Sequence, residues 1–443
     1  MTLAPRFGFA YHALPKVVLR GGFGMYPIAR GVNPASTAQS FAIQTGFSQS
    51  TALVPTLNNG QTFTANLASP YPNGLTPPTG SSLGASTFLG QALSFYNPAY
   101  PTPYSMQWNF NIQTLAPGQF LLELGYTGTH SIRLPLQRNM DAIPNQYLST
   151  SPVRDQANID YLSTQVPNPF AGLLPGTNLN TATVARSQLL APFPQFTGVT
   201  MNDYQGYASY NALQVRVERR FNKGFTTLLG YSFSKNLAAE NYYTFASGAY
   251  LNGADPTPSR AIAGIDRPHT LAITALWELP FGKGRTWLSG VNRLADLFIG
   301  GWQLSAVETL QSGVPLTFGN VLFAGNIKDI AIDGSQRKPE RWFNTSGFVT
   351  APAQQLSMNK RTFPVRLAGV RAGRYHSQDV SLLKNIVIHE RHRFQYRFEA
   401  YNLFNHPTAF TGAVMDPTSS AFGQVTATNA LPRQLQMGIK YLF

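Results

Sequence analysis

The sequence has no cysteine and few charged residues. Without cysteine, the chain has no disulfide bond, thiolate metal site or cysteine nucleophile. Charged residues make up 12% of its 443 residues, which is about half the usual share of a soluble globular domain. No run of 18 or more apolar residues occurs, so the sequence predicts no transmembrane helix.

Aromatic residues and glycine are abundant instead, with 30 Phe, 20 Tyr and 38 Gly. Low charge and many aromatic residues suit a transmembrane β-barrel, whose hydrophobicity alternates along each strand. The formal net charge is +14, but the basic residues are spread out, and no arm-like run of Lys and Arg predicts a nucleic-acid partner.

Several segments alternate between apolar and polar residues, as a strand with two different faces does. The clearest is YSMQWNFNIQ at 104–113, and the chain ends in the same way with RQLQMGIKYLF at 433–443. We count about eleven such strands of roughly ten residues, the length that a tilted membrane strand needs.

The connections between these strands alternate between short and long. Short turns lie near 13–15, 115–118, 222–224 and 389–391, with a medium one at 280–297. Long segments lie near 27–102, 130–206, 236–266, 313–376 and 405–431. Outer-membrane barrels have short periplasmic turns and long extracellular loops. We therefore predict an all-β, antiparallel outer-membrane barrel that occupies residues 1–443 as one domain, with the long segments outside the cell.

Three groups of side chains are candidates for a role in such a barrel. Trp108, Tyr126 and Trp277 are candidates for the aromatic girdle at the membrane boundary, with packing inside a soluble sandwich as the alternative. Arg216, Glu218 and Arg220 share one polar strand face, and Arg393, Arg397 and Glu399 share another. These six residues are predicted to line the lumen, where they guide an anionic solute, contact a plug, or form an ordinary salt-bridged wall.

The third group lies in the long segment 313–376 and is basic: Arg337, Lys338, Arg341, Lys360 and Arg361. An exposed basic loop steers anionic ligands or neutralises lipopolysaccharide phosphates. By contrast, HERH at 389–392 and FGKGR at 281–285 lack the spacing and context of a zinc helix or a phosphate loop. We expect no metal, no cofactor and no enzymatic activity.

Four segments together resemble one known family. They are DRPHTLAITALWELPFGKGR (266–285), GGWQLSAVETLQSGVPLT (300–317), FEAYNLFNHPTAF (398–410) and RQLQMGIKYLF. They resemble the C-terminal barrel of Oar-like TonB-dependent receptors of the acidobacterial type, and PRFGFAYHALPKVVLRGGFGMY (5–26) resembles their mid-barrel segment. Tyr441 and Phe443 then resemble the terminal signal for assembly in the outer membrane.

The resemblance implies uptake or export of a large solute across the cell outer membrane, powered through TonB. It also implies contacts with membrane lipid, lipopolysaccharide and the barrel assembly machinery. Complete members of the family have a signal peptide, a regulatory domain and a plug, which this sequence lacks. They also have a barrel of 22 strands, of which this sequence predicts about eleven. We expect this chain to be the C-terminal half of such a receptor, with TonB contacted through the missing N-terminal part. A passive porin or an adhesion scaffold is the alternative.

Overall fold

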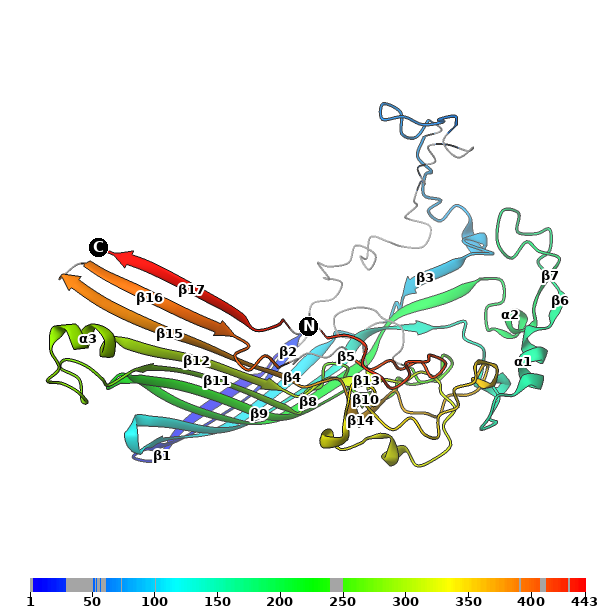
Figure 1. The fold of residues 1–443 in the computed structure, drawn as a ribbon. Helices are drawn as coiled ribbons and strands as arrows, with labels where there is room; N and C mark the ends of the chain where they lie inside the picture. Colours follow the sequence, from blue (N-terminus) through cyan, green and yellow to red (C-terminus); the bar gives the residue numbers. More distant parts are fainter. Residues whose placement is uncertain are drawn as a thin grey trace.

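The computed structural model describes residues 3–28, 51, 53, 56, 61–72, 74–99, 101–239, 250–389, 392–406, 412–428 and 431–443. One large antiparallel sheet dominates it, with eleven strands hydrogen-bonded in chain order (Figure 1). In that order the strands are β1 (Arg6–Leu14), β2 (Val17–Pro27), β4 (Tyr104–Ala116), β5 (Phe120–Asn139), β8 (Gly198–Asn222), β9 (Phe225–Ala239), β11 (His269–Glu278), β12 (Trp302–Gln311), β15 (Tyr375–His389), β16 (His392–Tyr401) and β17 (Gln434–Leu442).

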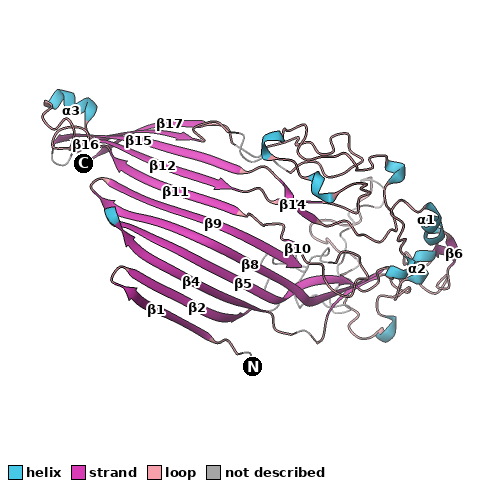
Figure 2. Ribbon diagram, turned by 90° about the horizontal axis from the view of Figure 1, so that it is seen from below, coloured by secondary structure: helices cyan, strands magenta, loops and turns pink. Residues whose placement is uncertain are grey.

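The predicted all-β class and antiparallel order are confirmed. Figure 2 shows the strands side by side in one curved sheet with β1 at one margin and β17 at the other. Within the described residues the sheet is open, because β1 pairs only with β2 and β17 only with β16. The closed barrel is thus not present in the described part of the chain.

The two faces of the sheet differ in polarity, because side chains alternate along each strand. The register places Phe110, Tyr126 and Leu213 in one row on one face. We call this the apolar face; its exposed members on the outer strands include Phe7, Phe9, Tyr11, Leu435, Met437 and Ile439. The opposite face carries Asn, Gln, Ser and charged residues, and we call it the polar face.

The register also reveals how strongly the strands are tilted. Register partners can be followed from one strand to the next across the sheet. Starting from Leu435 on β17, they lead to Ala116, the last residue of β4. The apolar stretch of β4 therefore ends where that of β17 begins. A level apolar band then needs a shift of about one residue per strand, or a tilt of roughly 35° at ordinary strand spacing. Membrane barrels have similar tilts.

The two ends of the sheet are built differently. At one end the strands join through tight turns, except that β11 and β12 are joined through helix α3 (Arg293–Ile299). At the other end β5 and β8 run beyond their neighbours, further into the predicted segment 130–206 than expected. The extended β8 pairs in parallel with β3 (Ala92–Tyr96). The segments 27–102, 236–266 and 405–431 lie partly outside the described residues.

The long connections contain small elements of their own. They are α1 (Gln156–Ser163), β6 (Gln165–Pro167), β7 (Thr183–Ala185), α2 (Arg186–Leu190), β10 (Ala261–Ile262), β13 (Pro315–Thr317) and β14 (Arg366–Arg371). Short 3-10 turns lie at Gly84–Ser86, Pro117–Gln119, Asn145–Tyr147, Ile327–Ile330, Gly334–Gln336 and Pro352–Gln354.

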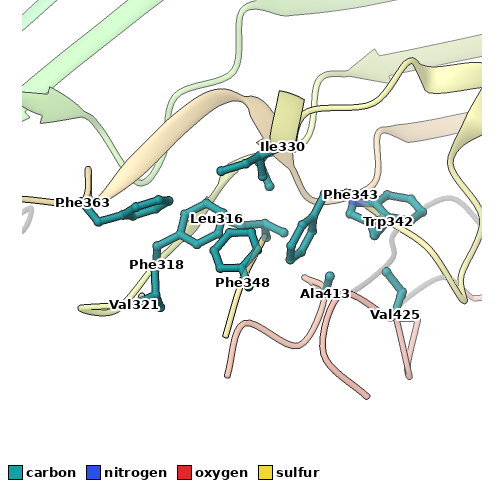
Figure 3. Packing of buried hydrophobic residues seen from close by; sticks show 11 residues of the cluster. Leu316, Phe318, Val321, Ile330, Trp342, Phe343, Phe348, Phe363, Ala413 and Val425 are labelled. Carbon is teal, nitrogen blue, oxygen red and sulfur yellow. The ribbon is translucent and has the colours of Figure 1, made fainter. Parts of the chain in front are cut away.

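The largest buried core lies in these connections rather than under the sheet. It joins residues from 316–370 to Ala413 and Val425 of the last connection, and Figure 3 shows its side chains packed together. Phe318 contacts three other phenylalanines, with ring centroids 5.2 to 5.9 Å apart. We call this unit the loop module. Such aromatic contacts add stability beyond burial alone, so the described residues of this cluster pack as one unit.

Candidate functional site

The first group of candidate lumen residues lies on the polar face of β8 as a linked set. The Arg216 Nη2 atom is 2.7 Å from Glu218 Oε2, and Arg220 Nε is 3.8 Å from Glu218 Oε1. Both arginines are exposed, so these pairs add little to stability. Glu123 on β5 is the register partner of Arg216, so two arginines and two glutamates share this part of the wall, and their formal charges balance.

The second group lies on the polar face of β16. Arg397 Nη1 is 3.6 Å from Glu399 Oε1, and Arg393 is exposed near the end of the strand. Four strands, β9, β11, β12 and β15, separate β8 from β16, so the two groups are not brought together. Between β5 and β11 the polar face holds a shallow hollow of about 470 Å³, lined in part by Glu123, Gln214 and Arg216.

The girdle candidates all lie on the apolar face. The Trp108 indole lies over Gly128, where an added Cβ would be 2.3 Å from the ring. The Tyr126 hydroxyl donates to Asn211 Oδ1 at 2.7 Å. Trp277 pairs with Phe225 at the end of the sheet that carries the tight turns. Trp108 and Tyr126 thus lie toward one end of the sheet and Trp277 toward the other.

The terminal aromatic residues form a stack at the end of β17. The Tyr441 ring lies 5.0 Å from Phe394 and 5.7 Å from Phe443. Phe443 is 91% exposed, so this stack leaves the last ring free for contact. The structure gives these residues an accessible position, and their role as an assembly signal stays a prediction.

The basic loop candidates separate into two kinds. Arg337 and Arg361 brace the loop module, because their guanidinium groups donate to Gly369 O at 2.9 Å and to Phe318 O at 2.7 Å. Burial lowers the pKa of both side chains from its ordinary value, and for Arg337 the nearby Arg371 lowers it further. Lys338, Arg341 and Lys360 are exposed on the module, and these three are free to meet an anion.

A buried ion pair that sequence reasoning missed holds the loop module to the sheet. Arg371 Nη2 is 2.6 Å from Asp266 Oδ2, and the two side chains are 13% and 2% exposed. Asp266 Oδ1 also accepts the Asn236 N–H, and Arg371 Nη1 donates to Asp266 O. Asp266 is the first residue of the DRPH segment and lies between a long connection and a strand. This position is the sequence feature that could have indicated a buried ion pair.

No cluster of three or more His, Asp or Glu residues suited to a metal occurs in the described parts of the chain. Among the described helices, none is long and apolar enough to cross a membrane.

A family model described as an outer membrane beta barrel domain matches residues 1–436. No curated protein sequence matches the chain. The chain is similar in structure to the outer membrane transporter YddB from Escherichia coli, with 9% identity, a TM-score of 0.45, and coverage of 97% of this chain and 39% of that one. It is also similar to the ferric-catecholate import receptor Fiu from E. coli, with 9% identity, a TM-score of 0.40, and coverage of 99% and 34%.

A third similar structure is the siderophore receptor PirA from Acinetobacter baumannii, with 9% identity, a TM-score of 0.41, and coverage of 99% and 41%. The chain therefore spans less than half the length of each of these proteins. The family assignment rests on the match to the family model, which covers nearly all of the chain.

Proposed function

The chain belongs to the outer membrane beta barrel domain family and is located in the cell outer membrane, and we propose that it forms part of the barrel wall of an Oar-like TonB-dependent receptor. In that role the apolar face contacts lipid and the polar face lines the path of a large solute. The observation that carries this proposal is the charged polar face of β8 and β16 beneath a packed loop module. A transport wall has this combination of a wet lining and ordered loops.

The long connections are placed outside the cell in this proposal. Their ordered module supports a recognition role, because binding residues held on a rigid scaffold lose little freedom when a ligand arrives. Lys338, Arg341 and Lys360 are exposed cations on this module. They are the proposed contacts for an anionic solute or for lipopolysaccharide phosphates.

The open sheet supports the proposal that further strands complete the barrel. All ten neighbouring pairs from β1 to β17 are antiparallel, so β1 and β17 point in the same direction. Joining these two edges makes a parallel pair, and so does joining copies of the chain inserted in one orientation. An odd number of added strands restores antiparallel pairing and an even total, as in bacterial barrels. A 22-stranded barrel needs eleven more strands, which is an odd number.

Unpaired edges cannot persist in lipid, because their N–H and C=O groups find no water there. The missing strands are therefore assigned to polypeptide beyond residues 1–443, and the resemblance to TonB-dependent receptors assigns the plug and the TonB contact there as well. In this proposal the chain alone has no gate.

The test of transport compares four strains of the host: wild type, a strain without this gene, a strain with inactive TonB, and the complemented deletion. Mass spectrometry follows which solutes each strain removes from a complex medium. We expect at least one solute whose depletion needs both the gene and TonB. Depletion that needs the gene but not TonB would contradict the proposal and favour a passive porin. No gene-dependent depletion would favour an adhesion scaffold.

A further inference from the structure

Helix α3 carries an exposed apolar face at the end of the sheet that has the tight turns. Leu294, Leu297 and Phe298 are 74%, 40% and 77% exposed. Their spacing of three and four residues places all three on one side of the helix. Such a face normally packs on a core, but within the described residues these three side chains remain exposed.

The other side of α3 is fixed to the apolar face of the sheet. The Trp302 Nε1–H donates to Phe298 O at 2.8 Å, and Lys384 Nζ donates to Gly300 O. Trp302 and Lys384 are register partners in one row of the apolar face, together with Tyr396 and Ile439. The C-terminal end of α3 therefore lies over the face of the sheet that meets lipid.

The N-terminal end of α3 reaches the last residues of β15. The Asn292 side chain caps the helix by accepting the Ala295 N–H at 2.8 Å, and Arg293 Nη2 donates to Ile388 O at 3.4 Å. The helix thus runs along the last residues of β15, from Ile388 toward Lys384. Figure 2 shows α3 beside the ends of β15 and β16.

A glycine permits this close approach. A Cβ at Gly301, whose φ is +72°, would be 2.4 Å from the backbone oxygen of Asn385 on β15. Both the backbone conformation and the lack of space at this position require glycine. Gly301 therefore lets the chain turn from α3 into β12 close against β15.

We infer that α3 is an interfacial helix whose apolar face inserts into the phospholipid leaflet at this end of the barrel. Its apolar side continues the lipid-facing surface of the sheet through Trp302. The exposed cations Lys283 and Arg293 flank it, and cations beside an apolar helix face suit anionic headgroups. The inference depends on the outer-membrane location of the chain and not on transport.

The test places a fluorophore on the helix and a quencher in the lipid. Because the chain has no cysteine, a Phe298→Cys variant of the whole native polypeptide has its label at one site if the remaining polypeptide is also made cysteine-free. The protein is reconstituted in vesicles of phosphatidylethanolamine and phosphatidylglycerol with nitroxide-labelled phospholipid. Ile439→Cys, on the exposed apolar face of β17, is the reference for lipid contact. Lys223→Cys, in the tight turn between β8 and β9, is the reference for water.

We expect headgroup and shallow-chain nitroxides to quench the label at 298 at least half as strongly as the label at 439, and several times more strongly than the label at 223. Quenching at 298 as weak as at 223, with strong quenching at 439, would overturn the inference and leave the outer-membrane wall intact. Weak quenching at all three sites would overturn both. Adding Leu294→Asp to Phe298→Cys should reduce quenching at 298, whereas adding Ser289→Asp should not.

Discussion

At the scale of single residues, the buried pair Arg371–Asp266 connects the loop module to the sheet. Both groups are removed from water, and each also bonds to the main chain. Removing one partner of a buried pair leaves the other charge uncompensated, which costs about 3–5 kcal/mol. Arg374, three residues away, is exposed and makes a suitable comparison.

We therefore predict that Arg371→Ala loosens the attachment of the loop module. Limited proteolysis of the native protein should cut the segment 313–376 at least tenfold faster in Arg371→Ala than in wild type. Arg374→Ala should be cut at the wild-type rate. Equal rates in both variants would show that the ion pair does not hold the module.

Acid sensitivity is expected at Asp155, the N-cap of α1. Its carboxylate accepts the Ser149 hydroxyl at 2.7 Å and the Asn158 N–H at 3.0 Å, and these bonds lower the pKa of Asp155 from its ordinary 3.8. A lowered pKa in the folded state means that the carboxylate stabilises the fold above the ordinary pKa. That stabilisation is lost as the pH falls through the lower, folded-state pKa.

Hydrogen exchange of residues 149–163 measures this effect. After correction for the intrinsic rate, protection should be constant from pH 7 to pH 5 and should fall below about pH 4. In Asp155→Asn the pH dependence of protection should be much weaker. A wild-type protection that is unchanged down to pH 2.5 would refute the role of the Asp155 carboxylate.

At the scale of elements, the strands were largely predictable and the connections were not. Strict alternation in 104–113 and 433–443 identified β4 and β17, because a strand with one apolar and one polar face repeats every two residues. The loop module was not foreseen, since its aromatic residues are scattered over two connections and meet only through tertiary packing. Arg337 and Arg361 show the same limit: their basic character is visible in the sequence, but their burial is not.

The pairing of Trp108 with Gly128 gives a prediction for β4 and β5. A methyl group at position 128 collides with the indole, and overpacking of this kind costs about 1–3 kcal/mol. Gly230 on β9 has open space where its Cβ would be. Urea unfolding in detergent should therefore show a lower midpoint for Gly128→Ala, while Gly230→Ala should match wild type. A fall of the same size in both variants would mean that the indole does not set the effect.

At the scale of the whole molecule, the direction of the two edge strands decides how a barrel can close. Because β1 and β17 are parallel to one another, residues 1–443 expressed alone are predicted not to form a stable monomer in a membrane. Electrophoresis with and without heating tests this, since folded barrels migrate differently until they are boiled. A heat-modifiable monomer that conducts ions in a planar bilayer would contradict it.

The gene sequence gives a second test of the prediction that further strands complete the barrel. The DNA upstream of the Met1 codon is expected to stay open and to encode an odd number of further strands, preceded by a plug. A stop codon followed by a ribosome-binding site at Met1 would contradict the proposal that these strands belong to the same polypeptide.

The central claim is that the sheet is a membrane wall with lipid on one face and a water-filled path on the other. The most direct measurement is reaction of single cysteines along β4 in the whole native protein, otherwise free of cysteine, in its outer membrane. A small water-soluble thiol reagent should label Asn109→Cys and Asn111→Cys, whereas a lipid-soluble one should label Phe110→Cys and Ile112→Cys. Labelling that does not alternate between neighbouring positions would contradict the claim.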